Sequence, residues 1–136
     1  METTIDRRAL LSTLWIVLML DYIYCDVLGL HDPAYLAAIQ SGTVAGIDIV
    51  PAFLVGAGVL MQLPIWMVLL SRILPRRINR PISIVAAVVM IVVQIGSLLD
   101  GPTPLYVFFS IVEIGLLLAI VVIVATWRIP QVDNAV

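Results

Sequence analysis

The sequence contains no lysine, and all seven of its basic residues are arginine. It therefore has no amine for a retinal or pyridoxal Schiff base and no lysine for a Walker-type phosphate loop. Its single cysteine, Cys25, excludes an intrachain disulfide and a CxxC redox pair. Its single histidine, His31, excludes a bis-histidine haem site or a histidine-rich metal centre within one chain. These absences remove several well-known enzyme chemistries, and they leave no predicted metal or cofactor.

Charge of either sign is also scarce in this chain. Only 12% of its 136 residues are charged and 62% are apolar, against about 25% and about 45–50% in soluble domains. The mean hydropathy is +1.17. A soluble fold of this size cannot bury so much apolar surface. This composition excludes a soluble enzyme, a nucleic-acid-binding module and a disordered protein, and it predicts the lipid bilayer as the main partner.

Four apolar stretches are long enough to cross a hydrocarbon core of about 30 Å, which needs about 20 helical residues. The runs are continuous rather than alternating, so they indicate helices and not a β-barrel. We expect one all-α membrane domain over residues 1–136, an integral four-helix bundle. Proline, glycine and aspartate punctuate it, and Pro33–Gln40 is expected to form a short interfacial helix. The spans are placed near 9–30, 50–70, 82–99 and 105–127, with an outer loop at 31–49.

The arginines lie on only one side of these spans, before the first, around the second connection and after the fourth. Because cytoplasmic loops carry the excess of basic residues, both termini are predicted to be cytoplasmic, in the inner (plasma) membrane. Arg7 and Arg8 do not indicate a cleaved signal peptide, since the following run is too long and lacks a cleavage site. The arginines are Arg7, Arg8, Arg72, Arg76, Arg77, Arg80 and Arg128, whereas the first and third connections carry Asp32, Asp48 and Asp100.

Three carboxylates lie within the predicted spans: Asp21, Asp26 and Glu113. A charge inside the membrane costs about 2.5–3.5 kcal/mol on insertion scales, so such residues usually face the protein interior. With a rise of about 1.5 Å per residue, Asp21 lies roughly 13 Å and Glu113 roughly 12 Å from the outer ends of their helices. The two acids are thus predicted at one level, with Asp26 nearer the outer boundary.

Helical phase adds polar companions to these acids. At about 100° per residue, Trp15, Tyr22 and Asp26 share one face of the first helix. Tyr24 follows Asp21 by three residues and is expected to flank it. The other expected inward residues are Tyr106 and Ser110, which share a face with Glu113, and Gln94 and Gln62 from the third and second helices.

These residues predict an acidic pocket in the outer half of the bundle, with no cation inside the spans. Without a cationic partner, buried carboxyl groups are most stable in the protonated form, and two close together share a proton. Two interpretations stay open. The group is a proton-coupled site or a pocket for a cationic or hydroxyl-bearing small molecule. Alternatively, the protonated acids only hold the helices together through hydrogen bonds.

The chain resembles a family of small bacterial four-span membrane proteins known only as a domain of unknown function. The resemblance covers nearly the whole chain and implies a four-helix bundle in a bacterial inner membrane, with no activity to transfer. It rests on Leu14-Trp15, Tyr22-Ile23-Tyr24, Asp26, Arg77-Ile78-Asn79-Arg80, Tyr106, Glu113 and Trp127-Arg128.

Three functions are weighed on this basis. The first is a small transporter or ligand-binding protein, with a parallel homodimer or higher homo-oligomer favoured because the arginine bias opposes an antiparallel dimer. The second is an accessory subunit that packs on another membrane protein through small residues such as Ala52 and Gly56. An intramembrane enzyme is the least favoured, because no nucleophile, metal set or cofactor motif accompanies the carboxylates.

Overall fold

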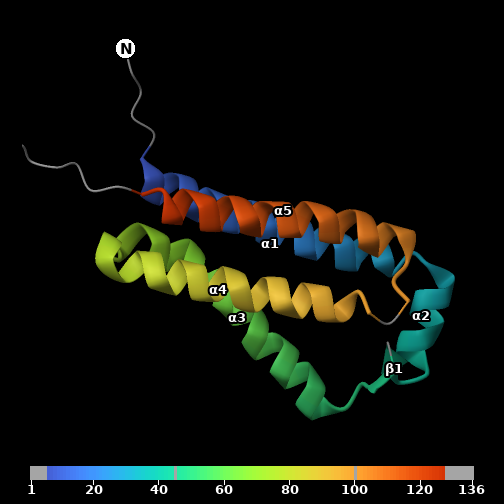
Figure 1. Cartoon of the computed structure of the whole chain (residues 1–136). Helices are drawn as coiled ribbons and strands as arrows, with labels where there is room; N and C mark the ends of the chain where they lie inside the picture. Colours follow the sequence, from blue (N-terminus) through green and yellow to red (C-terminus); the bar gives the residue numbers. More distant parts are fainter. Residues whose placement is uncertain (1–5, 45, 100, 128–136) are drawn as a thin grey trace, which may run out of the picture.

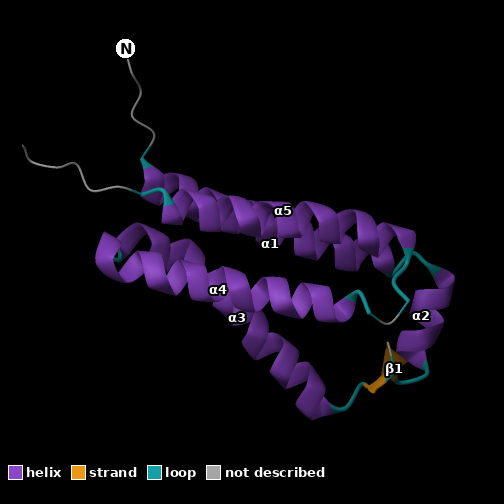
Figure 2. Cartoon of the chain, viewed as in Figure 1, coloured by secondary structure: helices purple, strands orange, loops and turns teal. Residues whose placement is uncertain are grey.

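The computed structural model describes residues 6–44, 46–99 and 101–127, and these are mostly helical (Figures 1 and 2). Each of the four predicted apolar stretches carries one long helix. All four helices are long and apolar enough to cross a membrane, so the chain is a multi-span membrane protein. The helices are α1 (Arg7–Gly29), α3 (Pro51–Ile73), α4 (Arg76–Ser97) and α5 (Pro104–Ala125). Two residues of the orientation argument, Asp100 and Arg128, lie outside the described residues.

The loop between α1 and α3 contains a short helix and also two short strands, which the all-α prediction did not include. It forms the expected short helix α2 (Pro33–Gln40), whose first turn is capped by the Asp32 carboxylate. A small antiparallel ribbon follows, made of β1 (Thr43–Val44) and β2 (Ile47–Asp48). The ribbon was not predicted. Its backbone uses positive φ values at Gly42 and Gly46, a conformation that glycine adopts without steric cost.

Side-chain caps mark the starts of two long helices, and a glycine turn precedes one of them. The Asp6 carboxylate accepts the backbone N–H of Arg8 and caps α1. The Thr103 hydroxyl accepts the backbone N–H of Tyr106 and caps α5, after a turn that uses a positive φ at Gly101. These caps satisfy backbone donors that would otherwise be unpaired at a helix start.

Helix α1 is the centre of the packing. It lies against α3 and α5, while α4 packs mainly on α5. In Figure 1, α1 and α5 run side by side, and α4 lies below them. Large apolar side chains fill the interface in the half of the bundle away from α2. The principal buried ones are Leu11, Trp15, Leu18, Met67, Met90, Leu117, Ile120 and Val124.

The first half of α3 lies apart from this core. Figure 1 shows it diverging from the other three long helices, and residues 51–59 are all exposed. Ala52 and Gly56 are among them, and no side chain lies within 4 Å of the position a Gly56 Cβ would take. This small-residue pair is therefore not a packing seam inside the bundle. Packing of α3 against the core starts at Leu60 and Met61, and Pro64 is its first buried residue.

A buried amide joins α3 to α4. Asn79 is fully buried, and its Nδ2 donates to the backbone carbonyl of Ser71 at 2.8 Å. Its Oδ1 accepts the hydroxyl of Ser83 at 2.9 Å. The side chain thus fixes the start of α4 against the end of α3, where the two helices are separated by a short turn.

Replacing Asn79 with alanine should destabilise the bundle by about 1–2 kcal/mol, because it leaves the Ser71 carbonyl and the Ser83 hydroxyl without their partner. Thermal unfolding of the purified chain in mild detergent measures this loss. Gln62→Ala removes an amide from an exposed position and is the matched control, with an expected change under about 0.5 kcal/mol. Equal unfolding midpoints for the two variants would contradict a structural role for Asn79.

Candidate functional site

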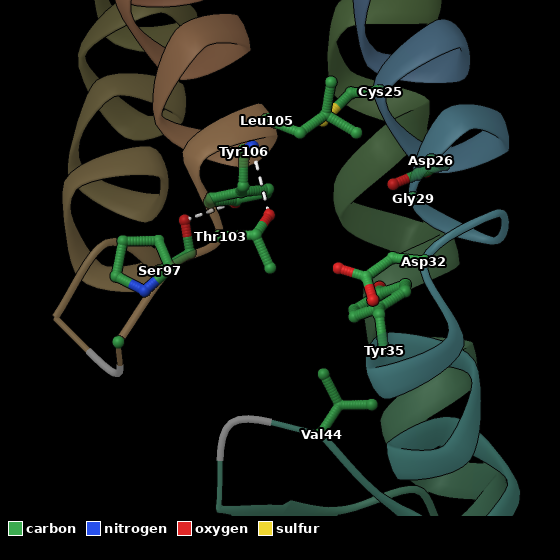
Figure 3. Close-up of a pocket in the computed structure, with 12 residues that line it drawn as sticks. Cys25, Asp26, Gly29, Asp32, Tyr35, Val44, Ser97, Thr103, Leu105 and Tyr106 are labelled. Atoms are coloured by element: carbon green, nitrogen blue, oxygen red, sulfur yellow. Dashed lines mark hydrogen bonds between the residues drawn. The ribbon is translucent and has the colours of Figure 1, made fainter.

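A cavity of about 320 Å³ lies where the end of α1 and the start of α2 face the end of α4 and the start of α5. We call it the acidic-end pocket, because it lies at the end of the bundle whose connections carry aspartates and no arginine. The sequence predicts this end to be outside. Figure 3 shows the Asp26 and Asp32 carboxylates directed into the space between these elements, opposite Thr103 and Tyr106. Tyr35 and Cys25 also line the cavity.

The pocket has a negative character. Asp26 and Asp32 both line it, and none of its lining residues is basic. One oxygen of Asp32 is already engaged by the backbone N–H of Ala34, which leaves Asp26 as the less constrained carboxylate. Burial raises the pKa of the Tyr35 phenol, and the nearby Asp26 carboxylate adds to the effect. Tyr35 therefore stays neutral and keeps its O–H as a donor, while the two acids favour a positively charged occupant.

Beneath the pocket, α4 and α5 are joined by hydrogen-bonded side chains. The hydroxyls of Tyr106 and Ser97 are 2.6 Å apart. The Gln94 amide nitrogen donates to the Ser110 hydroxyl at 2.7 Å and lies 3.5 Å from the Tyr106 hydroxyl. Since Tyr106 also lines the pocket, these groups connect the pocket to the polar interior of the bundle.

One helical turn deeper lies a layer of polar groups that the described part of the chain leaves unpartnered. Glu113 is 1% exposed, and its Oε2 has no hydrogen-bond partner there. The same holds for the Tyr22 hydroxyl and Asp21 Oδ2, and also for Trp15 Nε1, which lies about two helical turns further from the pocket, in the apolar core. Glu113 is within electrostatic reach of Asp21 and Asp26. Folded proteins keep such orphaned groups rare, so Asp21, Tyr22 and Glu113 stand out among the polar groups of the described residues.

Most of the residues singled out from the sequence lie in or beside this region. Asp26 and Tyr106 line the pocket, and Asp21 is half-buried below it. The buried members of the predicted set are Trp15, Tyr22, Gln94, Ser110 and Glu113.

Two of the expected inward residues face away. Tyr24 is 62% exposed, because two residues of helix place it about 200° from the buried Tyr22. It does not flank Asp21 toward the interior. Gln62 is exposed as well, because two residues of helix place it about 200° from the buried Pro64. Neither residue lines the acidic-end pocket.

Several lining residues were not singled out as site residues from the sequence. Cys25 was interpreted as a small apolar residue and Asp32 as a loop marker, while Tyr35, Ser97 and Thr103 carried no assignment. Helical phase offers a signal for Ser97, since it follows Gln94 by three residues on the same face of α4. The remaining residues come from segments brought together only by the tertiary fold.

The chain belongs to a family of unknown function (DUF6326), whose family model matches residues 1–134. The resemblance to a family of unknown function noted from the sequence is therefore confirmed. Comparisons with curated proteins and with solved structures found no match. Any function has to be argued from the geometry of this chain.

The natural Cys25 offers a direct test of the pocket's charge, since it is the single cysteine and lines the cavity. A cationic methanethiosulfonate reagent should modify it faster than an anionic one, after each rate is divided by the rate with a free thiol. Asp26→Asn should lower this ratio up to about thirtyfold, because one contact charge in water is worth about 1 kcal/mol and acts with opposite sign on the two reagents. Mass spectrometry of the intact protein gives the rates.

Asp48→Asn is the matched control, since Asp48 is an exposed acid of β2, in the segment that connects α1 to α3, and does not line the pocket. Its ratio should equal that of the unmodified chain. A ratio insensitive to Asp26→Asn would show that the cavity does not have the acidic character assigned to it.

Proposed function

We propose that this member of a family of unknown function binds a small organic cation in the acidic-end pocket and links that binding to the protonation of Glu113. One observation carries the proposal. The described lining includes two carboxylates and no basic side chain, and the cavity lies above the buried carboxyl of Glu113, whose Oε2 has no hydrogen-bond partner in the described residues. An acidic cavity of about 320 Å³ suits a small ligand.

The lining supplies three kinds of recognition. The Asp26 carboxylate provides the opposite charge. Tyr35 and Tyr106 offer aromatic faces, which attract an ammonium group through the ring quadrupole. The Tyr35 and Ser97 hydroxyls can pair with a hydroxyl or amine of the ligand. These groups favour an organic ammonium compound over a metal ion, because a metal would require more closely grouped oxygen ligands.

Glu113 gives the binding a dependence on pH. Asp21 and Asp26 face it from α1, together with Tyr22 and Cys25, while α5 adds Tyr106 and α4 adds the uncharged Gln94. A cation in the pocket stabilises a negative charge on Glu113 and therefore promotes release of its proton. By linkage, loss of that proton strengthens cation binding, so affinity should rise with pH.

Transport of the cation against a proton is the extension of this binding function. A bundle of four helices encloses little space, so a translocation path would need a second copy of the chain. The arginine bias supports a parallel arrangement, with the arginine-rich end and both termini in the cytoplasm. A hydrophobic chain with this orientation belongs in the inner membrane.

The exposed first half of α3 supports a second function, that of an accessory subunit. Its small residues Ala52 and Gly56 would allow the backbone of another transmembrane helix to approach closely. Recovery of a stable hetero-complex in mild detergent, lost on Gly56→Leu, would favour this function over the first.

Choline and its neutral carbon isostere 3,3-dimethylbutan-1-ol test the proposed charge recognition. Calorimetric titration of the full chain in detergent should give binding of choline at least about tenfold tighter than of the isostere, a difference of about 1.4 kcal/mol. Asp26→Asn should weaken choline binding about fivefold or more, whereas Asp48→Asn should leave it unchanged. Equal binding of the two compounds, or no binding of either, would contradict cation recognition.

The role of Glu113 is tested by the same titration at several pH values. Choline binding to the unmodified chain should strengthen as pH rises, since ionised Glu113 adds a negative charge near the cation. Glu113→Gln preserves the shape of the neutral carboxyl but cannot ionise. The variant should therefore bind choline with an affinity that lacks the pH dependence due to ionisation of Glu113. A pH dependence that is identical in the variant would rule out linkage through Glu113.

A further inference from the structure

The arginines gather at the end of the bundle opposite the acidic-end pocket. At this basic end, α1 and α4 begin and α3 and α5 end (Figure 1). Two helix starts and two helix ends have opposite partial charges of about half a unit each, so their contributions roughly cancel. Side chains therefore determine the local charge. Among the described residues, this end carries six arginines, Arg7, Arg8, Arg72, Arg76, Arg77 and Arg80, against one carboxylate, Asp6.

Three of these arginines hold the end of α5. Arg7 Nη1 donates to the Ile123 carbonyl at 3.1 Å, and Arg80 Nη2 donates to the Ala125 carbonyl at 3.3 Å. Arg76 Nη2 donates to the carbonyl of Trp127. These carbonyls belong to the last turn of the helix or follow it, where backbone acceptors lack partners within the helix. The contacts orient the side chains, and no carboxylate of residues 6–44, 46–99 or 101–127 pairs with these three arginines.

A groove of about 390 Å³ lies beside this cluster on α4. Arg76, Arg77 and Arg80 line its basic part, and Pro81 and Ile84 line its apolar part, further along the same helix. Arg76 Nε is buried and has no acceptor in the described part of the chain. The groove thus combines guanidinium donors, one of them unsatisfied, with an apolar wall that continues into the membrane-spanning region of α4.

We propose that this groove binds an anionic phospholipid, with the headgroup phosphate on Arg76, Arg77 and Arg80 and an acyl chain along Pro81 and Ile84. Guanidinium groups suit this ligand because their planar donors bond two phosphate oxygens at once. The apolar wall distinguishes a lipid from a free phosphate, which would gain nothing from Pro81 and Ile84. Basic pockets beside transmembrane helices are suitable sites for such headgroups.

Native mass spectrometry of the full chain, delipidated in mild detergent, tests the proposal with equimolar dioleoyl phosphatidylglycerol and dioleoyl phosphatidylcholine. The chain should retain the anionic lipid in preference. Arg77→Gln should weaken its apparent affinity about fivefold, since each basic residue near an anionic lipid contributes about that factor. Arg77 is exposed and is not one of the three arginines that bond α5, so its loss should leave the fold intact.

Arg8→Gln is the matched control, because it removes one positive charge from the same end without touching the groove. It should retain the preference. Arg77→Lys keeps the charge but loses the bidentate geometry, so it should give an intermediate loss of affinity for the anionic lipid. This variant replaces Arg77→Gln in the test if Arg77→Gln does not fold. Equal losses of affinity in Arg8→Gln and Arg77→Gln would overturn the proposal, and so would equal retention of the two lipids. Binding of inorganic phosphate in the absence of lipid, with the same dependence on Arg77, would also overturn it.

Discussion

Every polar group of a helix bundle surrounded by hydrocarbon has to find its partner inside the protein, because lipid offers no hydrogen bonds. The four long helices meet this requirement for the backbone. The side chains meet it in layers: Asn79 joins α3 to α4, Gln94 joins α4 to α5, and Ser12 donates to the Val68 carbonyl between α1 and α3. These polar contacts are directional, whereas apolar contact with lipid or with another helix is not. They therefore determine which helix faces meet.

Several polar side chains in the bundle have an atom with no partner in the described residues. The free-energy cost of leaving them unpaired helps to decide between a structural and a functional explanation. A buried polar group without a partner costs about 1–3 kcal/mol. Glu113, Tyr22, Trp15 and Asp21 each contribute one such atom in the described residues. Their combined cost is comparable to the whole stability of an ordinary domain, about 5–15 kcal/mol. A purely structural polar cluster would have paired these groups with one another, as Gln94 and Ser110 are paired. The lack of pairing is instead what the proposed proton-linked binding of a ligand requires.

Local signals made much of the fold predictable. Length and hydropathy located four helices, and Asp32-Pro33 marked the start of α2, because caps and prolines act within a few residues. Helical phase placed Tyr22 and Glu113 inward, whereas the expectation that Tyr24 flanks Asp21 was wrong, because it ignored the rotation of about 200° between Tyr24 and the inward-facing Tyr22. The inward placement of Gln62 was wrong, because α3 is apolar on all sides and its sequence does not mark which face turns toward the bundle. The pocket was not predictable either, because Asp32, Tyr35 and Thr103 meet only after α2 folds back beside the α4–α5 turn.

The complete lack of lysine has a structural counterpart at the basic end. There, each of Arg7, Arg76 and Arg80 bonds a carbonyl at the end of α5 through one terminal nitrogen. A guanidinium has five donors spread over a rigid plane, so it can hold that carbonyl and still present donors outward. A lysine ammonium concentrates its three donors on one atom, and a bond to the carbonyl would draw the whole charge inward. Arginine therefore lets one set of side chains both close the end of a helix and keep that end of the protein positively charged at the membrane surface.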